Sequence, residues 1–106
     1  MRVFLTAALF ALSTTAMADT LVYNITIKDH VFSPSEITIP ANQRVKFIIE
    51  NQDVTPEEFE GLNFDVEKII PGKTKSTVFV GPFAAGTYNF MGEFNADTAK
   101  GQIIVE

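Results

Sequence analysis

The sequence predicts an all-β fold, a sandwich of two β-sheets, and three observations lead to this prediction. Apolar and polar residues alternate with a period of two in several short segments, as they do in strands with one buried face. Turn residues recur at a spacing of roughly ten residues, which is typical of a β-sandwich. No segment of useful length has the period of a helix. Without repeats or linkers, the chain is expected to form one domain.

The expected strands follow one another in short segments bounded by turns. In the first, Tyr23, Ile25 and Ile27 alternate with polar neighbours. A Pro or Gly-Pro pair closes several of the others. The expected strands are residues 23–28, 37–39, 45–50, 64–70, 74–80, 86–91 and 101–106. The inward positions that we expect to supply much of the core are Phe32, Phe47, Phe79 and Phe90.

The N-terminal segment has the pattern of a secretory signal peptide. Arg2 gives a positive start, an apolar run follows, and Ala16-Met17-Ala18 forms a small-x-small cleavage pattern. The apolar run has about ten residues, whereas a membrane-spanning helix needs about 20. We therefore predict a signal peptide at residues 1–18, a domain at 19–106, and no membrane insertion after cleavage.

Charge and composition exclude several classes of function. Without Arg2, the sequence has seven basic and thirteen acidic side chains, so the formal charge is −6 with His30 neutral. Such an acidic domain is a poor candidate for binding nucleic acid or anionic lipid, and a reasonable one for binding cations. The chain has no Cys, which excludes a thiolate metal ligand or a cysteine nucleophile. No nucleophile–base pair or phosphate-binding loop is evident either.

Several segments, taken in order, resemble the cupredoxins. These segments are residues 32–37, 39–41, 45–47, 86–90 and 101–105, with Asn51. The resemblance covers essentially all of residues 19–106 and implies a cupredoxin-like Greek-key β-sandwich of about seven to eight strands. In that alignment the first His, the Cys and the second His of a blue-copper centre fall at Glu57, Gly92 and Asn95. The Met falls near Ala99 or Lys100, so all four ligands are replaced and blue-copper electron transfer is excluded.

The chain more specifically resembles the EfeO-type cupredoxin-like family, which is associated with bacterial iron uptake. The longest matching segment is Thr55-Pro56-Glu57-Glu58-Phe59-Glu60, and Gly92-Glu93-Phe94 and residues 97–101 also match. Relatives often carry His at the position of Asn95. The resemblance implies a periplasmic protein, with a membrane iron permease or its accessory proteins as a partner.

Acidic residues at the former copper end are the main candidate metal ligands. Glu57 occupies a former ligand position, and Glu93 follows Gly92, where the missing side chain leaves room. We expect Glu57 and Glu93 to meet across this rim, because carboxylates are hard oxygen ligands. For the segment containing Glu58 and Glu60, Thr55-Pro56-Glu57-Glu58 also has the pattern of a capping box, which favours a short helical turn.

His30 and Asp97 are further candidates for the same site. His30 is the only histidine, and in cupredoxins the loop after the first strand reaches the metal-site rim. A surface turn is the alternative for His30, and a capping role is the alternative for Asp97. The expected metal ligands are therefore Glu57, Glu93, His30, Glu60 and Asp97.

The function expected from these residues is metal handling, with iron, including Fe(II), or copper as the bound ion. We expect a binding or accessory role rather than an enzymatic one, because oxidation of ferrous iron needs an electron acceptor and no redox centre is evident. A metal-free interaction module is one alternative. A copper-binding shuttle is another, although one His and no Cys are a poor donor set for copper.

Overall fold

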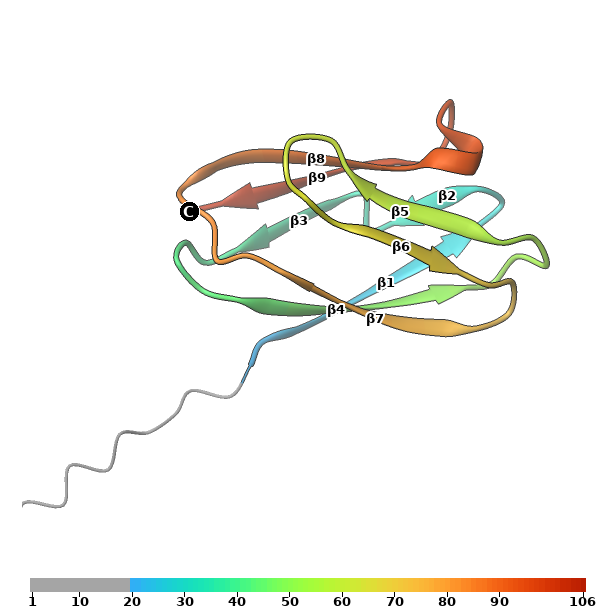
Figure 1. Ribbon diagram of the computed structural model, residues 1–106, viewed down its shortest axis with the longest axis horizontal. Coiled ribbons are helices and arrows are strands. Elements are labelled where there is room, and N and C mark those ends of the chain that lie inside the picture. Colours follow the sequence, from blue (N-terminus) through green and yellow to red (C-terminus); the bar gives the residue numbers. More distant parts are fainter. Residues whose placement is uncertain (1–19) are drawn as a thin grey trace, which may run out of the picture.

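The fold is a β-sandwich of two sheets, shown by a computed structural model that describes residues 20–106 (Figure 1). The predicted signal peptide at residues 1–18 lies outside the described residues. The first sheet contains, in spatial order, β2 (Val31–Ser33), β1 (Val22–Lys28), β4 (Val45–Asn51) and β7 (Lys75–Val80). The second contains β3 (Glu36–Ile39), β9 (Lys100–Val105), β8 (Gly86–Gly92), β5 (Glu57–Gly61) and β6 (Glu67–Ile70).

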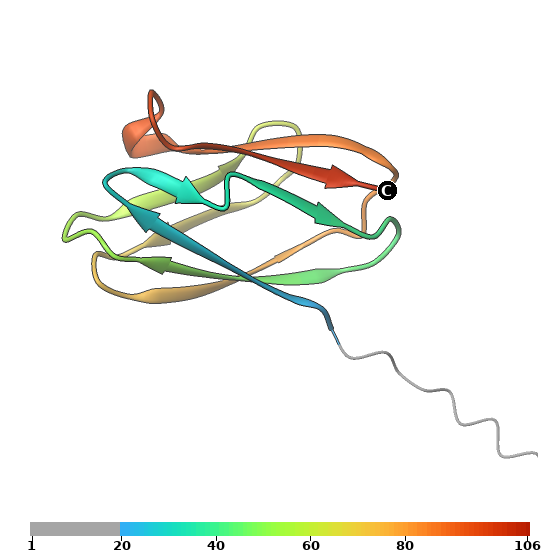
Figure 2. The ribbon, with the colours of Figure 1, turned by 180° about the vertical axis from the view of Figure 1, so that it is seen from behind.

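Two parallel pairings distinguish this sandwich from a simple series of hairpins. β1 pairs in parallel with β4, and β3 pairs in parallel with β9, while the other neighbours are antiparallel. A short 3-10 helix, η1 (Glu93–Asn95), begins the connection from β8 to β9 at one end of the sandwich (Figure 2). The all-β prediction is confirmed, with nine strands in the described residues where seven to eight were expected.

The core consists of side chains at alternate positions along the strands, which point to the inside of the sandwich. Four phenylalanines pack together at its centre: the ring centroids of Phe32 and Phe90 are 5.1 Å apart, and those of Phe59 and Phe90 are 4.9 Å apart. Phe47 contacts Phe59 edge-on at 6.4 Å. These rings are all at most 1% exposed, so burial of large apolar surface stabilises the fold where no disulfide is available.

The inward prediction for Phe79 is wrong. Its side chain is 45% exposed, because β7 turns Val78 and Val80 toward the core instead. Arg44 lies over the outer face of the Phe79 ring, with its guanidinium carbon 4.3 Å from the ring centroid. The prediction of a strand in this segment is confirmed, but the alternate set of its side chains faces the core.

The predicted helical turn at Thr55–Glu58 is also wrong. The segment from Glu57 onward is strand β5, which pairs with β6 on one side and with β8 on the other. Pairing on both sides satisfies the backbone groups that a helix would otherwise use, so tertiary context overrides the local capping pattern. No helix within residues 20–106 is both long enough and apolar enough to cross a membrane.

Candidate metal centre

The carboxylate of Glu57, the residue at the position that the resemblance assigns to the first His ligand of a cupredoxin, is buried. Glu57 is the first residue of β5, points to the inner side of the sheet, and is 1% exposed. Its Oε1 accepts hydrogen bonds from the backbone N–H groups of Glu58 (3.0 Å) and Phe94 (2.9 Å). Its Oε2 accepts one from the side-chain amide of Asn95 at 2.7 Å. Both oxygens therefore have partners within the protein, as a buried carboxylate requires.

The four positions aligned with blue-copper ligands do come together. A Cβ atom added to Gly92 would lie 2.5 Å from Cδ of Glu57 and 2.7 Å from Cβ of Ala99. Asn95 is hydrogen-bonded to the same carboxylate. The space next to Gly92, where a thiolate sulfur would project, is thus filled by the Glu57 carboxylate. These residues do not fit a blue-copper ion, which needs a thiolate and imidazoles.

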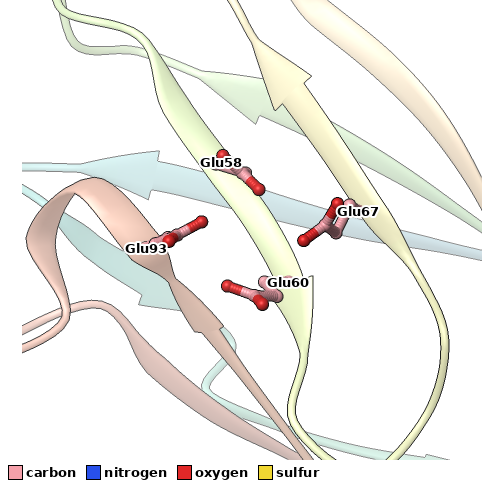
Figure 3. Close-up of side chains that lie close together, drawn as sticks. All are labelled: Glu58, Glu60, Glu67 and Glu93. Carbon is pink, nitrogen blue, oxygen red and sulfur yellow. The ribbon is translucent and has the colours of Figure 1, made fainter.

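A second group of acids gathers on the opposite, outer side of β5, and we call it the outer acidic cluster. It consists of Glu58 and Glu60 on β5, Glu67 on β6 and Glu93 on η1 (Figure 3). One carboxylate oxygen from each residue lies within 4.8 Å of the others. The Oε2 atom of Glu60 is buried and has no hydrogen-bond partner among residues 20–106.

Strand register explains why these four acids meet. Glu60 pairs directly with Glu67 across the antiparallel β5–β6 ladder, so both side chains emerge on one face. On the other side of β5, Phe59 pairs with Gly92. Continuing that register by one residue sets Glu93 beside Glu58. β5 therefore has an acidic neighbour on each side.

Loss of solvation, and after it the repulsion between neighbouring acids, raises the pKa of the two central carboxyls, Glu58 and Glu60. The pKa of Glu58 is raised, first by loss of solvation and then by the nearby Glu93. The pKa of Glu60 is raised in the same order, by loss of solvation and then by Glu93 and Glu67. Like charges opposite each other in a sheet are destabilising, so the cluster favours a bound proton or cation that reduces its negative charge.

His30 and Asp97 lie in a different place, a shallow hollow of about 390 Å³ beside η1. Asp53 accepts hydrogen bonds from the backbone N–H groups of Asp29 (2.8 Å) and His30 (3.0 Å). Its Oδ2 is also 3.5 Å from Nδ1 of His30. The hydrogen bond from the His30 N–H is the main reason that the pKa of Asp53 is lowered.

The structure therefore divides the sequence-predicted ligands among three places. Glu60 and Glu93 belong to the outer acidic cluster, Glu57 lies on the inner side of the sheet, and His30 and Asp97 line the hollow. Glu57 and Glu93 do not share a site, because β5 separates the inner carboxylate from the outer ones. The sequence reasoning missed Glu67. The alternation of Glu58 and Glu60 about the apolar Phe59 was the signal for a strand with an acidic outer face.

We expect E60Q to stabilise the cation-free protein at neutral pH. Because the folded state raises the pKa of Glu60 above its ordinary value of 4.5, ionisation of this group costs stability as the pH rises through the folded value. The difference from wild type should vanish below pH 4.5, where the carboxyl is protonated in both states. Urea unfolding at several pH values in chelator measures it, with E36Q at an exposed β3 position as the control. Equal stability of E60Q and wild type at every pH would contradict the repulsion.

Comparison with known proteins agrees with this architecture. The family model described as "Cupredoxin-like domain" matches residues 1–105. An uncharacterized protein of Rickettsia prowazekii (strain Madrid E) is 40% identical over 85 residues, which are 80% of this chain and 68% of that protein.

Solved structures show the same fold at low sequence identity. Auracyanin A, a "blue" copper protein from Chloroflexus aurantiacus, superposes with a TM-score of 0.73 at 15% identity, covering 82% of this chain and 99% of that one. The metal-binding domain of the Streptococcus pneumoniae D39 Cu(I)-exporting P-type ATPase CopA, solved with Cu(I), gives 0.70 at 12% identity over 86% and 91%. The match to the family model decides the assignment: this chain belongs to the cupredoxin-like domain family.

Proposed function

We propose that this protein binds a hard metal cation, iron foremost, at the outer acidic cluster and serves as a metal-binding accessory protein. The observation that carries this proposal is the convergence of four carboxylates within 4.8 Å. The buried, unpartnered Oε2 of Glu60 gives a bound cation a ligand atom that otherwise lacks a partner. A cation there would also offset the repulsion that, after loss of solvation, contributes to the raised pKa of Glu58 and Glu60.

The spacing of the cluster suits ions that prefer oxygen ligands. Oxygens on opposite sides of Ca²⁺ are roughly 4.6–5.2 Å apart, and around Mg²⁺ about 4.0–4.2 Å. The upper limit of 4.8 Å within the cluster lies within the Ca²⁺ range and above the Mg²⁺ range, so a smaller cation such as Fe(II) needs a small contraction. An all-carboxylate set favours such hard ions over copper, for which imidazole and sulfur are the better donors. This donor chemistry supports iron over the copper-shuttle alternative.

The biological setting is part of the same proposal. The resemblance to the EfeO-type family supports a periplasmic location and a membrane iron permease, or its accessory proteins, as the partner. The cluster supplies only carboxylates and no redox group, which supports binding of ferrous iron rather than its oxidation. The solved CopA domain with Cu(I) supports the general idea that this fold can hold a metal ion.

Titration of the purified protein with single metals tests the proposal. We expect one saturable site in calorimetry with Fe(II) under anaerobic conditions, and binding of Mn(II) or Ca(II) as well. The double variant E60Q/E93Q should weaken binding by about tenfold or more, because it removes two of the four charged ligands. E36Q/E106Q removes the same charge away from the cluster and should bind as wild type does.

Two outcomes would contradict the proposal: no saturable site for any hard cation, or a site that E60Q/E93Q leaves unchanged. A site that binds only Cu(II) would favour the copper-shuttle alternative. The closure of the former copper end by Glu57 favours a second candidate, a metal-free interaction module. Partner binding that weakens with salt but not with chelator would support that candidate.

A further inference from the structure

The inner carboxylate of Glu57 joins two segments that are far apart in sequence. Its hydrogen bonds to Phe94 N–H and to the Asn95 side chain link β5 to η1 across 37 and 38 residues. Both bonds end on a carboxylate that is only 1% exposed, and bonds to such a buried, charged acceptor are stronger than ordinary surface hydrogen bonds. No side chain caps the start of η1, and its N-cap residue, Gly92, is tied to the end of the loop by a hydrogen bond from its N–H to the carbonyl oxygen of Ala99 (2.9 Å).

The same short helix supplies one member of the outer acidic cluster. Glu93 begins η1 and is immediately followed by Phe94, whose N–H is bound to Glu57. The peptide group that links these two residues is therefore fixed on the inner side, while the Glu93 side chain reaches the outer side (Figure 3). Glu58 and Glu60 repel Glu93, so Glu93 would move away from them if η1 were not held in place.

We propose that Glu57 is the positioning residue of the outer acidic cluster, holding η1 so that Glu93 stays beside Glu58. This inference rests on the proposed function, in which the cluster binds a cation. Glu57 contributes no ligand atom itself. It ties β5 to the β8–β9 connection from the inner side and so holds the outer acidic cluster in place.

The test uses E57Q to weaken the hydrogen bond between residue 57 and the Asn95 side chain, and then N95D to restore that bond in the reverse direction. E57Q keeps the size of the side chain but removes its charge and one of its two acceptor oxygens, so the hydrogen bonds from Phe94 N–H and from Asn95 lose their charged acceptor. E57Q/N95D gives the NH₂ group of the new amide a carboxylate acceptor and keeps the net charge of the wild type. We expect E57Q to weaken cation binding by about 10–100-fold, the usual effect of losing a group that orients a ligand. E57Q/N95D should recover most of this loss.

Amide hydrogen exchange provides a readout that needs no metal. In E57Q the Phe94 amide should exchange faster, while amides in the β1–β4 ladder keep their wild-type protection. N95A is a milder variant, which removes one hydrogen bond and leaves Glu57 in place. It should show the same two effects to a smaller extent, and it serves as the test if E57Q does not fold.

The outcomes separate this inference from the proposed function. If the wild type binds no hard cation, the proposed function fails. The link between Glu57 and η1 is still established if the Phe94 amide is protected from exchange in the wild type and loses this protection in E57Q. If the wild type binds but E57Q and N95A bind equally well, Glu57 has no positioning role. Failure of E57Q/N95D to recover affinity relative to E57Q would also overturn the inference.

Discussion

G92A is expected to lower the free energy of unfolding by about 2–4 kcal/mol. The added methyl group would lie 2.5 Å from Cδ of Glu57, so the carboxylate must move or the strand must bend. Overpacking of a tight interior costs about 1–3 kcal/mol, and weakened hydrogen bonds to a charged group cost about 1.5–3 kcal/mol more when fully lost. The other close neighbour, Ala99, is fully buried and cannot give way easily.

The backbone gives no reason to expect this loss, which makes the substitution a clean test. Gly92 has φ −91° and ψ 106°, a conformation that alanine adopts readily. Where space is available, replacing Gly by Ala at such a position stabilises a protein by about 0.4–1 kcal/mol. The sign of the measured change therefore shows whether the space beside Gly92 is occupied.

A double-mutant cycle identifies the partner in this collision. E57A removes the carboxylate but leaves the contact with Ala99, so G92A should cost less in the E57A background than in the wild type, with a residual cost from Ala99. Urea unfolding of the four proteins gives the coupling energy, which we expect to be about 1–3 kcal/mol in this contact. A G92A protein as stable as the wild type, or additive effects of the two substitutions, would show that Glu57 does not fill the former thiolate position.

F59A should be the most damaging truncation in the core, lowering stability by about 3–5 kcal/mol. Phe59 is fully buried and contacts three other phenylalanines, at centroid distances of 4.9, 6.1 and 6.4 Å. It also lies on β5 between Glu58 and Glu60, so its loss removes the support beneath the outer acidic cluster. Thermal and urea unfolding both measure this effect.

F79A is the matched control for F59A, because it removes the same side chain from a half-exposed position. We expect a change of less than about 1 kcal/mol, mostly from the lost contact with Arg44. Comparable losses for F59A and F79A would mean that the rings are not buried as the structure shows.

The fold was predictable from sequence because its strands alternate strongly and its turns contain distinctive residues. The strands containing Ile25, Phe47 and Phe90 bury these residues as the alternation predicts. β5 was missed because Thr55-Pro56-Glu57-Glu58 matches a helix-capping pattern, and local patterns carry no information about pairing on both sides. Phe79 was assigned to the wrong face because β7 is apolar at consecutive positions, Val78, Phe79 and Val80, so either phase fits.

The candidate site was predictable only in part, for a similar reason. That the former copper ligand positions would converge followed from the resemblance, and Glu57, Gly92 and Asn95 do lie together. Which side of the sheet each carboxylate occupies depends on register, which no single segment specifies. Glu67 joins Glu60 only through the β5–β6 ladder, so its role could be seen only once the strands were paired.

The placement of β9 also has a consequence for the order in which this protein folds. β9 lies between β3 and β8, so the second sheet closes only when β9 is in place. Until then β3 has no neighbour in its own sheet, and the incomplete sheet has unpaired edges that invite association with other chains. Closure of this sheet should accordingly be a late step of folding, on the slow timescale, roughly milliseconds to seconds, of topologies closed by distant segments.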